Sequence, residues 1–191
     1  FTFNIDINLL KKKLVRAKKQ NKILKVLVVV HMAGSPADIF QIKKLSKKYN
    51  FRIIEDASHA IGARYNKSSL VGSCKYSDVT VFSLHPVKII TSGEGGIITT
   101  NSIEIFNKIK SLRSHGILRD KNHLIKKNYG YWYYEQKYLG YNYRLSDIHA
   151  ALGSSQLKKV SYFVKKRNEI ANYYKKKIKE KNILFQKVLK G

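Results

Sequence analysis

The chain has 191 residues, of which 43% are hydrophobic and 26% charged, proportions typical of a globular protein rather than a disordered or fibrous one. Its single cysteine, Cys74, excludes an intramolecular disulfide. No apolar run approaches the ~20 residues that cross a bilayer, and no basic-then-apolar leader opens the chain. We therefore expect a cytoplasmic globular protein with no membrane partner.

The net charge is +26, from 38 Lys and Arg residues against 12 Asp and Glu residues. Such an excess is typical of nucleic-acid-binding proteins, and the aromatic residues interleaved with lysines over 129–143 favour that alternative. The lysines, however, are spread along the whole length and fall on the expected outer faces of helices. We interpret them as a solvated surface that attracts phosphate-bearing substrates, and expect no nucleic-acid partner.

The first half of the chain alternates strand and helix patterns. Residues 24–30 form a nearly continuous apolar run, which predicts a strand buried on both faces of a parallel sheet. Apolar residues at helical spacing predict a helix over about 35–49, and residues 51–54 predict a short strand ending at Asp56. The order strand, helix, strand indicates a βαβ crossover.

The second half predicts two more strands and two helices. The strands are expected at 79–82 and 96–100, and a capping-box pattern predicts a helix over 101–112. Residues 113–143 are rich in aromatic side chains and are expected to be irregular. Residues 146–179 are predicted to form one long helix, bent or straight, and Gly153 within it indicates close packing or a kink.

Three polar residues lie where predicted strands end. Asp56 ends one strand, Ser83 follows the next, and Lys88 lies in the loop beyond Ser83. Open α/β sheets bind ligands at this edge, and a lysine flanked by Val87 and Ile89 is expected to be desolvated, which favours its nucleophilic neutral amine. Each residue alone is also compatible with a turn or a cap. The histidines and Cys74 show no metal-site spacing, so no metal ligand is expected.

Several linked motifs together carry a resemblance. These motifs are residues 55–62, 83–88 and 93–96, followed downstream by residues 113–116, 140–147 and 150–153. In order and content they are similar to the motifs of the DegT/DnrJ/EryC1/StrS family of pyridoxal-phosphate-dependent nucleotide-sugar aminotransferases. The resemblance covers about residues 1–180. Residues 30–34, His59 and residues 132–136 are most similar to the branch of that family that serves pseudaminic acid biosynthesis.

The resemblance implies a cofactor, pyridoxal 5′-phosphate, and a role for each matching residue. Lys88 would carry the cofactor as a Schiff base and act as the catalytic proton shuttle, and Asp56 would pair with the pyridine nitrogen. His59 would lie against the ring, and Ser83 would bind the phosphate. Asn142 would reach the phosphate in the neighbouring subunit of a homodimer. Lysine at position 88 favours transamination, since the family's dehydratases have histidine there.

The resemblance also implies the substrates and the fold. The expected donor is L-glutamate, and the expected acceptor is the 4-keto carbon of a UDP-linked 4-keto-6-deoxy-N-acetylhexosamine. The expected fold is the three-layer α/β/α large domain of a fold-type I transferase, mostly parallel and truncated at both ends. Residues 1–145 would be its central part, residues 146–180 a helix leading toward a small domain, and residues 181–191 the start of that domain.

Two other interpretations remain open. Members of this family are about twice as long as the chain, so the chain resembles a central fragment that is inactive by itself. It could also serve another 4-keto or 3-keto nucleotide sugar, or be a non-catalytic binding module that retains the fold. Intact Asp56, His59, Ser83, Lys88 and Asn142 favour the enzyme.

Overall fold

The computed structural model describes residues 2–118, 124–126 and 129–188. It divides the chain into two compact units, one formed by Phe1–Asn101 with Asp147–Gly191 and the other by Ser102–Ser146. Within the described residues, no helix is long and apolar enough to cross a membrane.

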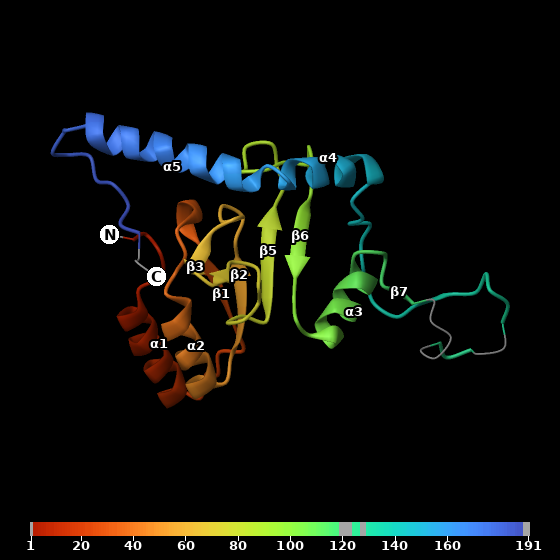
Figure 1. Cartoon of the computed structure of the whole chain (residues 1–191). Coiled ribbons are helices and arrows are strands. Elements are labelled where there is room, and N and C mark those ends of the chain that lie inside the picture. The colour runs from red at the N-terminus through yellow and green to blue at the C-terminus, as the bar shows by residue number, and fades with distance from the viewer. Residues whose placement is uncertain (1, 119–123, 127–128, 189–191) are drawn as a thin grey trace. The chain divides into compact units, whose positions relative to one another are not determined.

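The first unit is built on a four-stranded sheet (Figure 1). Its strands are β1 (Val26–Val30), β2 (Arg52–Asp56), β5 (Val79–Ser83) and β6 (Gly96–Thr99), in the order β1-β2-β5-β6. β1, β2 and β5 are parallel, and β6 runs antiparallel to β5. The predicted α/β class with a mostly parallel sheet is therefore confirmed.

Two helices cover one face of this sheet. α1 (Ile7–Lys19) begins at Asp6, whose carboxylate accepts two backbone N–H groups, and α2 (Ile39–Tyr49) begins at Asp38, whose carboxylate accepts the N–H of Gln41. Their apolar stripes pack on alternate strand residues to form the core, with Leu10, Leu14, Ile39, Ile42, Leu45, Val29, Ile53 and Phe82 all buried. The helix after β1 was predicted, whereas α1 was not.

The opposite face of β1 corrects one expectation. The strand was predicted to be buried on both faces, but Val26, Val28 and Val30 are 43%, 57% and 40% exposed, while Val29 between them is fully buried. Alternate side chains of a strand point to opposite faces, and α1 and α2 cover only the face of Val29. In the described part of the chain, nothing buries the outward valines to the same degree.

The long C-terminal helix is divided in two. α4 (Asp147–Leu157) and α5 (Val160–Lys177) are separated by a turn at Lys158 and Lys159, and both lie at the end of the sheet toward which β5 points (Figure 1). Gly153 in α4 is buried beside Ser92 and Leu84, so the predicted close packing is confirmed.

Smaller elements complete both units. A hairpin of β3 (Arg64–Asn66) and β4 (Ser69–Leu70) belongs to the first unit, with a short 3-10 turn, η1, at Met32–Gly34. The second unit holds α3 (Ile103–Leu112), capped by Ser102, and a pair of short strands, β7 (Ile117–Leu118) and β8 (Glu135–Gln136). The segment predicted to be irregular therefore contains one small antiparallel sheet.

Candidate active site

Asp56 is the last residue of β2, at the carboxyl edge of the parallel strands. It is in register with Val30 of β1 on one side and Val81 of β5 on the other. Its Oδ1 accepts the backbone N–H of Ser58 at 3.0 Å. This hydrogen bonding with Ser58 holds the pKa of Asp56 below its ordinary value, against partial burial, and nearby His59 acts in the same direction. Asp56 is therefore an ionised carboxylate at neutral pH.

Ser83 and Lys88 lie on the neighbouring strand and the loop that follows it. Ser83 ends β5, and its Oγ accepts the backbone N–H of His85 at 3.3 Å. The loop is closed at its base, since the N–H of Leu84 donates to the carbonyl of Gly95 and the N–H of Ser92 donates to the carbonyl of Leu84. Because β2 and β5 are adjacent and parallel, Asp56 and Ser83 end at the same edge of the sheet.

Lys88 is held through its backbone. Its N–H donates to the carbonyl of His85 at 3.0 Å, and its carbonyl accepts the side chain of Arg167 in α5 at 3.4 Å. The residue is half-buried, Ile90 beyond it is buried, and Val87 before it is 71% exposed. The expected apolar flanking is therefore present on one side of the lysine and absent on the other.

His59 lies in the loop after β2 and is exposed. The carbonyl oxygen of His59 approaches Gly34 so closely that a Cβ at position 34 would lie 2.7 Å from it. Gly34 has φ +82°, in the region that favours glycine. The loop after β1 thus fixes the backbone of the loop that carries His59.

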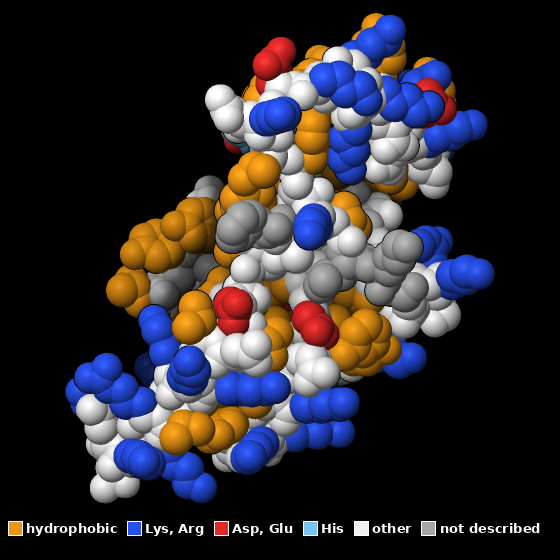
Figure 2. Space-filling view, turned by 90° about the vertical axis from the view of Figure 1, so that its left-hand side faces the viewer, with side chains coloured by type: hydrophobic (Ala, Val, Ile, Leu, Met, Phe, Trp, Pro, Cys, Tyr) orange, Lys and Arg blue, Asp and Glu red, His pale blue; other side chains and the backbone are white. Residues whose placement is uncertain are grey.

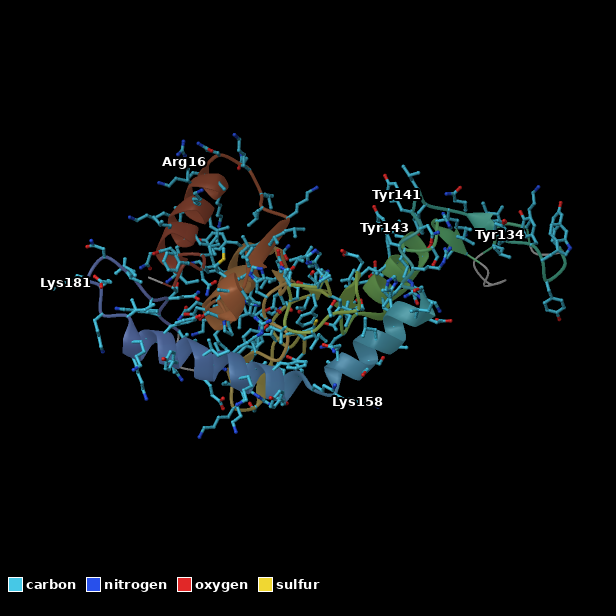
Figure 3. All side chains as sticks on the ribbon, turned by 90° about the horizontal axis from the view of Figure 1, so that it is seen from above. Arg16, Tyr134, Tyr141, Tyr143, Lys158 and Lys181 are labelled. Carbon is cyan, nitrogen blue, oxygen red and sulfur yellow. The ribbon has the colours of Figure 1, made fainter. Side chains whose placement is uncertain are left out.

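Asn142 belongs to the second unit, whereas the four residues above belong to the first. Its backbone pairs with Ser114 in an isolated antiparallel bridge. Tyr141 and Tyr143 on either side, labelled in Figure 3, stack on each other with ring centroids 5.2 Å apart. The structure therefore brings Asp56, His59, Ser83 and Lys88 to one unit and places Asn142 in the other.

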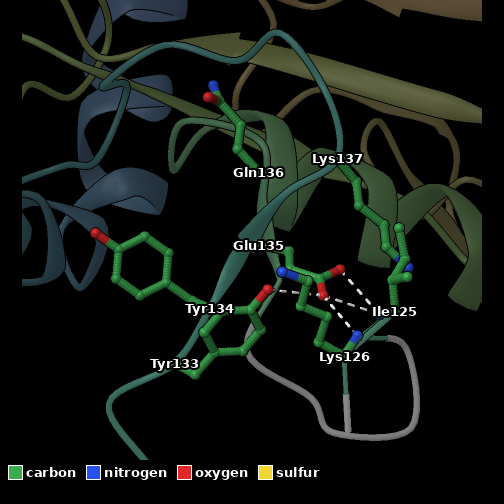
Figure 4. Close-up of a pocket in the computed structure, with 7 residues that line it drawn as sticks. All are labelled: Ile125, Lys126, Tyr133, Tyr134, Glu135, Gln136 and Lys137. Carbon is green, nitrogen blue, oxygen red and sulfur yellow. Dashed lines mark hydrogen bonds between the residues drawn. The ribbon is translucent and has the colours of Figure 1, made fainter. Parts of the chain in front are cut away.

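The second unit also contains a shallow hollow around Glu135 (Figure 4). The Glu135 carboxylate accepts the N–H groups of Ile125 and Lys126 at 2.9 Å and the hydroxyl of Tyr133 at 3.2 Å. These two backbone hydrogen bonds lower the pKa of Glu135. The carboxylate organises the surrounding aromatic segment, and its own hydrogen-bonding capacity is used within that segment.

Sequence reasoning missed two contributions to the site. Arg167 contacts the carbonyl of Lys88 from a helix far along the chain, and no local motif marks it. Thr91 closes the loop, since its hydroxyl donates to the carbonyl of Leu84 at 3.0 Å and accepts the N–H of Gly93 at 2.9 Å. A hydroxyl within a glycine-bounded loop is the kind of signal that could have identified Thr91.

Comparison with known proteins places this arrangement in a family context. Residues 1–189 match the sequence profile of the DegT/DnrJ/EryC1/StrS aminotransferase family. The UDP-4-amino-4,6-dideoxy-N-acetyl-beta-L-altrosamine transaminase of Campylobacter jejuni subsp. jejuni serotype O:2 is 45% identical, over 96% of this chain and 46% of its own length. The Helicobacter pylori transaminase of the same name is 38% identical, over 84% of this chain and 40% of its own length. The chain thus spans less than half the length of these curated relatives.

Solved structures agree with the predicted fold. Helicobacter pylori PseC, described as an aminotransferase involved in the biosynthesis of pseudoaminic acid, superposes with a TM-score of 0.79 at 36% identity, covering 94% of this chain and 43% of that one. A putative sugar aminotransferase from Streptococcus pneumoniae, solved in its PLP form, has a TM-score of 0.72 at 27% identity, covering 92% and 45%. The aminotransferase fold predicted from the motifs is therefore confirmed.

Proposed function

Because this chain belongs to the DegT/DnrJ/EryC1/StrS aminotransferase family, we propose that it provides the cofactor site of a pyridoxal-phosphate-dependent transaminase acting on a UDP-linked sugar. The observation that carries the proposal is the presence of Asp56 and Ser83 at adjacent strand ends, with Lys88 in the loop that follows Ser83, in a chain 45% identical to a named transaminase. The proposed reaction moves an amino group from L-glutamate to the 4-keto carbon of a UDP-linked 4-keto-6-deoxy-N-acetylhexosamine, in cytoplasmic pseudaminic acid biosynthesis.

The side chains of the first unit suit this cofactor chemically. Asp56 is ionised and can accept a hydrogen bond from a protonated ring nitrogen. Ser83 offers a hydroxyl to a phosphate, and His59 is exposed, so its imidazole is accessible to a ring. Lys88 offers the primary amine that a covalent link to the cofactor requires.

When bound, pyridoxal phosphate supplies an electron sink and carries the amino group between the two substrates. The chain's own residues then perform the remaining tasks. Asp56 keeps the ring nitrogen protonated, and the loop closed by Leu84, Thr91 and Ser92 fixes the backbone of Lys88. The free Nζ of Lys88 would move a proton from the donor carbon to the cofactor and, in the second half-reaction, from the cofactor to the acceptor carbon.

The domain division and the homodimer are part of the same proposal. Residues 1–145 would form the central part of the large domain, with residues 146–180 leading toward a small domain that begins at 181–191. Asn142, held by its bridge to Ser114, would serve the cofactor of the neighbouring subunit. Alternative acceptors are other 4-keto or 3-keto nucleotide sugars, since a GDP-perosamine synthase of Escherichia coli O157:H7 is also 35% identical.

Borohydride trapping tests the cofactor site. The purified chain is mixed with pyridoxal phosphate, reduced and mapped by mass spectrometry, with a far-UV spectrum of the same sample. We expect the pyridoxyl mass on the peptide of Lys88, its loss in Lys88→Ala, and its retention in Lys44→Ala, which changes an exposed helix residue. Labels scattered over the surface lysines of a folded chain would contradict the proposal. A binding module, by contrast, would retain its ligand in Lys88→Ala.

A further inference from the structure

A cluster of buried polar side chains lies beneath the strand ends, on the face of the sheet opposite Asp56. Its members, named here the Glu55 cluster, are His31, Glu55, Tyr65, Ser77 and Thr80. Glu55 is 1% exposed and His31 is fully buried. A buried carboxylate is costly unless hydrogen bonds compensate it, so its retention here requires an explanation.

Hydrogen bonds from four side chains satisfy the Glu55 carboxylate. Oε2 accepts the Nε2–H of His31 at 2.8 Å and the hydroxyl of Tyr65, while Oε1 accepts the hydroxyls of Ser77 and Thr80, the latter at 3.1 Å. Burial alone would raise the pKa of Glu55, but the hydrogen bonds from His31, Ser77 and Tyr65 outweigh it and lower that pKa. Glu55 is therefore a buried anion held by four donors from three segments: the loop after β1, β3, and the stretch from Ser77 to Thr80.

The hydrogen bond at Nδ1 of His31 determines which of its two ring nitrogens carries the proton. The backbone N–H of Ala37 donates to Nδ1 at 3.1 Å, so Nδ1 carries no proton. Nε2 must then carry the proton and donate it to Glu55, which makes the imidazole a neutral bridge. His31 thus connects Ala37, in the loop before α2, to the carboxylate of Glu55 in β2.

The same residues also hold the backbone of Asp56. The N–H of His31 donates to the carbonyl of Asp56 at 3.0 Å, and the N–H of Ala57 donates to the carbonyl of Val81 at 2.8 Å. Because side chains alternate along a strand, Glu55 points into the cluster and Asp56 points to the other face. The end of β2 is therefore fixed through a side chain on one face while it presents a carboxylate on the other.

We propose that Glu55 and His31 are positioning residues for Asp56, acting through the Glu55 cluster to hold the carboxyl end of β2 between β1 and β5. The proposal rests on the function proposed above, in which Asp56 pairs with the cofactor ring. It assigns a purpose to the buried anion, because displacement of a catalytic group by about 1 Å can cost ~100-fold in rate. His31 and Glu55 themselves need not touch the cofactor.

Amide hydrogen exchange on the chain without cofactor tests this role at single residues. In Glu55→Gln and Glu55→Ala, we expect the amides of His31 and Ala57 to exchange at least about tenfold faster, while the amides of α2 keep their protection. Asp78→Asn is the matched control, since Asp78 clamps the amino end of β2 by accepting the N–H of Ile53 at 2.8 Å. That variant should leave the amides of His31 and Ala57 unchanged.

A pair of His31 variants separates positioning from general stability, and remains informative if Glu55→Ala does not fold. Gln at position 31 can still donate to Glu55, whereas Asn can only replace the acceptor of the Ala37 N–H. We expect His31→Gln to preserve protection at Ala57 and the low pKa of the Asp56 carboxyl measured by NMR, and His31→Asn to lose both. The reverse order, or a uniform change over all amides, would overturn the proposal. Failure of cofactor trapping in the unaltered chain would instead count only against the proposed function.

Discussion

At the scale of single residues, backbone conformation governs how closely the loops at the sheet edge approach one another. Gly34 has φ +82°, and the carbonyl oxygen of His59 lies 2.7 Å from the position that a Cβ would take. Gly153 differs, because a Cβ there would meet Ser92 at 3.4 Å, an ordinary contact, within a helix. Backbone conformation and close approach therefore favour glycine at position 34, whereas a Cβ at position 153 would make only an ordinary contact.

We expect Gly34→Ala to lower the free energy of unfolding by about 1–3 kcal/mol, because it adds both backbone strain and a steric overlap. Gly153→Ala should leave the free energy of unfolding unchanged or raise it by up to about 1 kcal/mol through helix propensity. Urea unfolding of the two variants beside the unaltered chain measures both effects. Equal stability of the two variants would refute the close approach to His59.

At the scale of elements, α1 contributes to the core although its sequence pattern was not recognised. Leu10 and Leu14 are 7% and 4% exposed, whereas Leu9 on the outer side of the same helix is 59% exposed. Asp6 and the apolar spacing of residues 7, 10, 14 and 17 were available as signals. The lysines between them obscured the stripe, since most positions of the helix are solvated.

Leu14→Ala should therefore lower the free energy of unfolding by about 2–5 kcal/mol, the range for a buried leucine. Leu9→Ala should change it by less than about 0.5 kcal/mol, as is typical of surface substitutions. Chemical denaturation followed by circular dichroism provides the comparison. A small effect of Leu14→Ala would mean that α1 is not part of the cooperative core.

The remaining elements show what a sequence can and cannot predict. The run at 24–30 and the helical spacing before Tyr49 predicted β1, α2 and their crossover, because local periodicity reports secondary structure directly. The same run led to the wrong prediction that β1 is buried on both faces. Burial depends on which helices cover each face of the sheet, and the sequence of the strand alone does not report that. The strand pattern located Asp56 and Ser83 at the ends of adjacent strands and Lys88 in the loop that follows, but the Glu55 cluster draws on four segments and has no local signature.

At the scale of the whole molecule, the charge distribution is a property of the surface rather than of one site. Lys and Arg side chains are scattered among apolar and neutral ones over the face drawn in Figure 2. With a net charge of +26, repulsion among like charges opposes the compact state. Salt screens this repulsion over distances beyond the Debye length, which is about 10 Å at ~0.1 M.

Raising the NaCl concentration from about 0.05 M to about 0.5 M should therefore increase the free energy of unfolding. Replacing Lys11, Lys12 and Lys13, all exposed on α1, with glutamine should reduce this dependence on salt. Urea midpoints at each salt concentration measure it. A stability that falls with salt would show that local ion pairs, such as Arg52 with Asp78 at 2.7 Å, dominate the surface electrostatics.

β1 is an edge strand of the four-stranded sheet, and this position affects the tendency of the protein to aggregate. Its five residues are all β-branched or leucine, contain no glycine or proline, and carry an unpaired backbone edge within the described sheet. Such an edge is a template for pairing with a strand of another molecule, the first step of fibrous aggregation. Lys25, exposed just before β1, is a charged residue that flanks this segment and opposes such pairing.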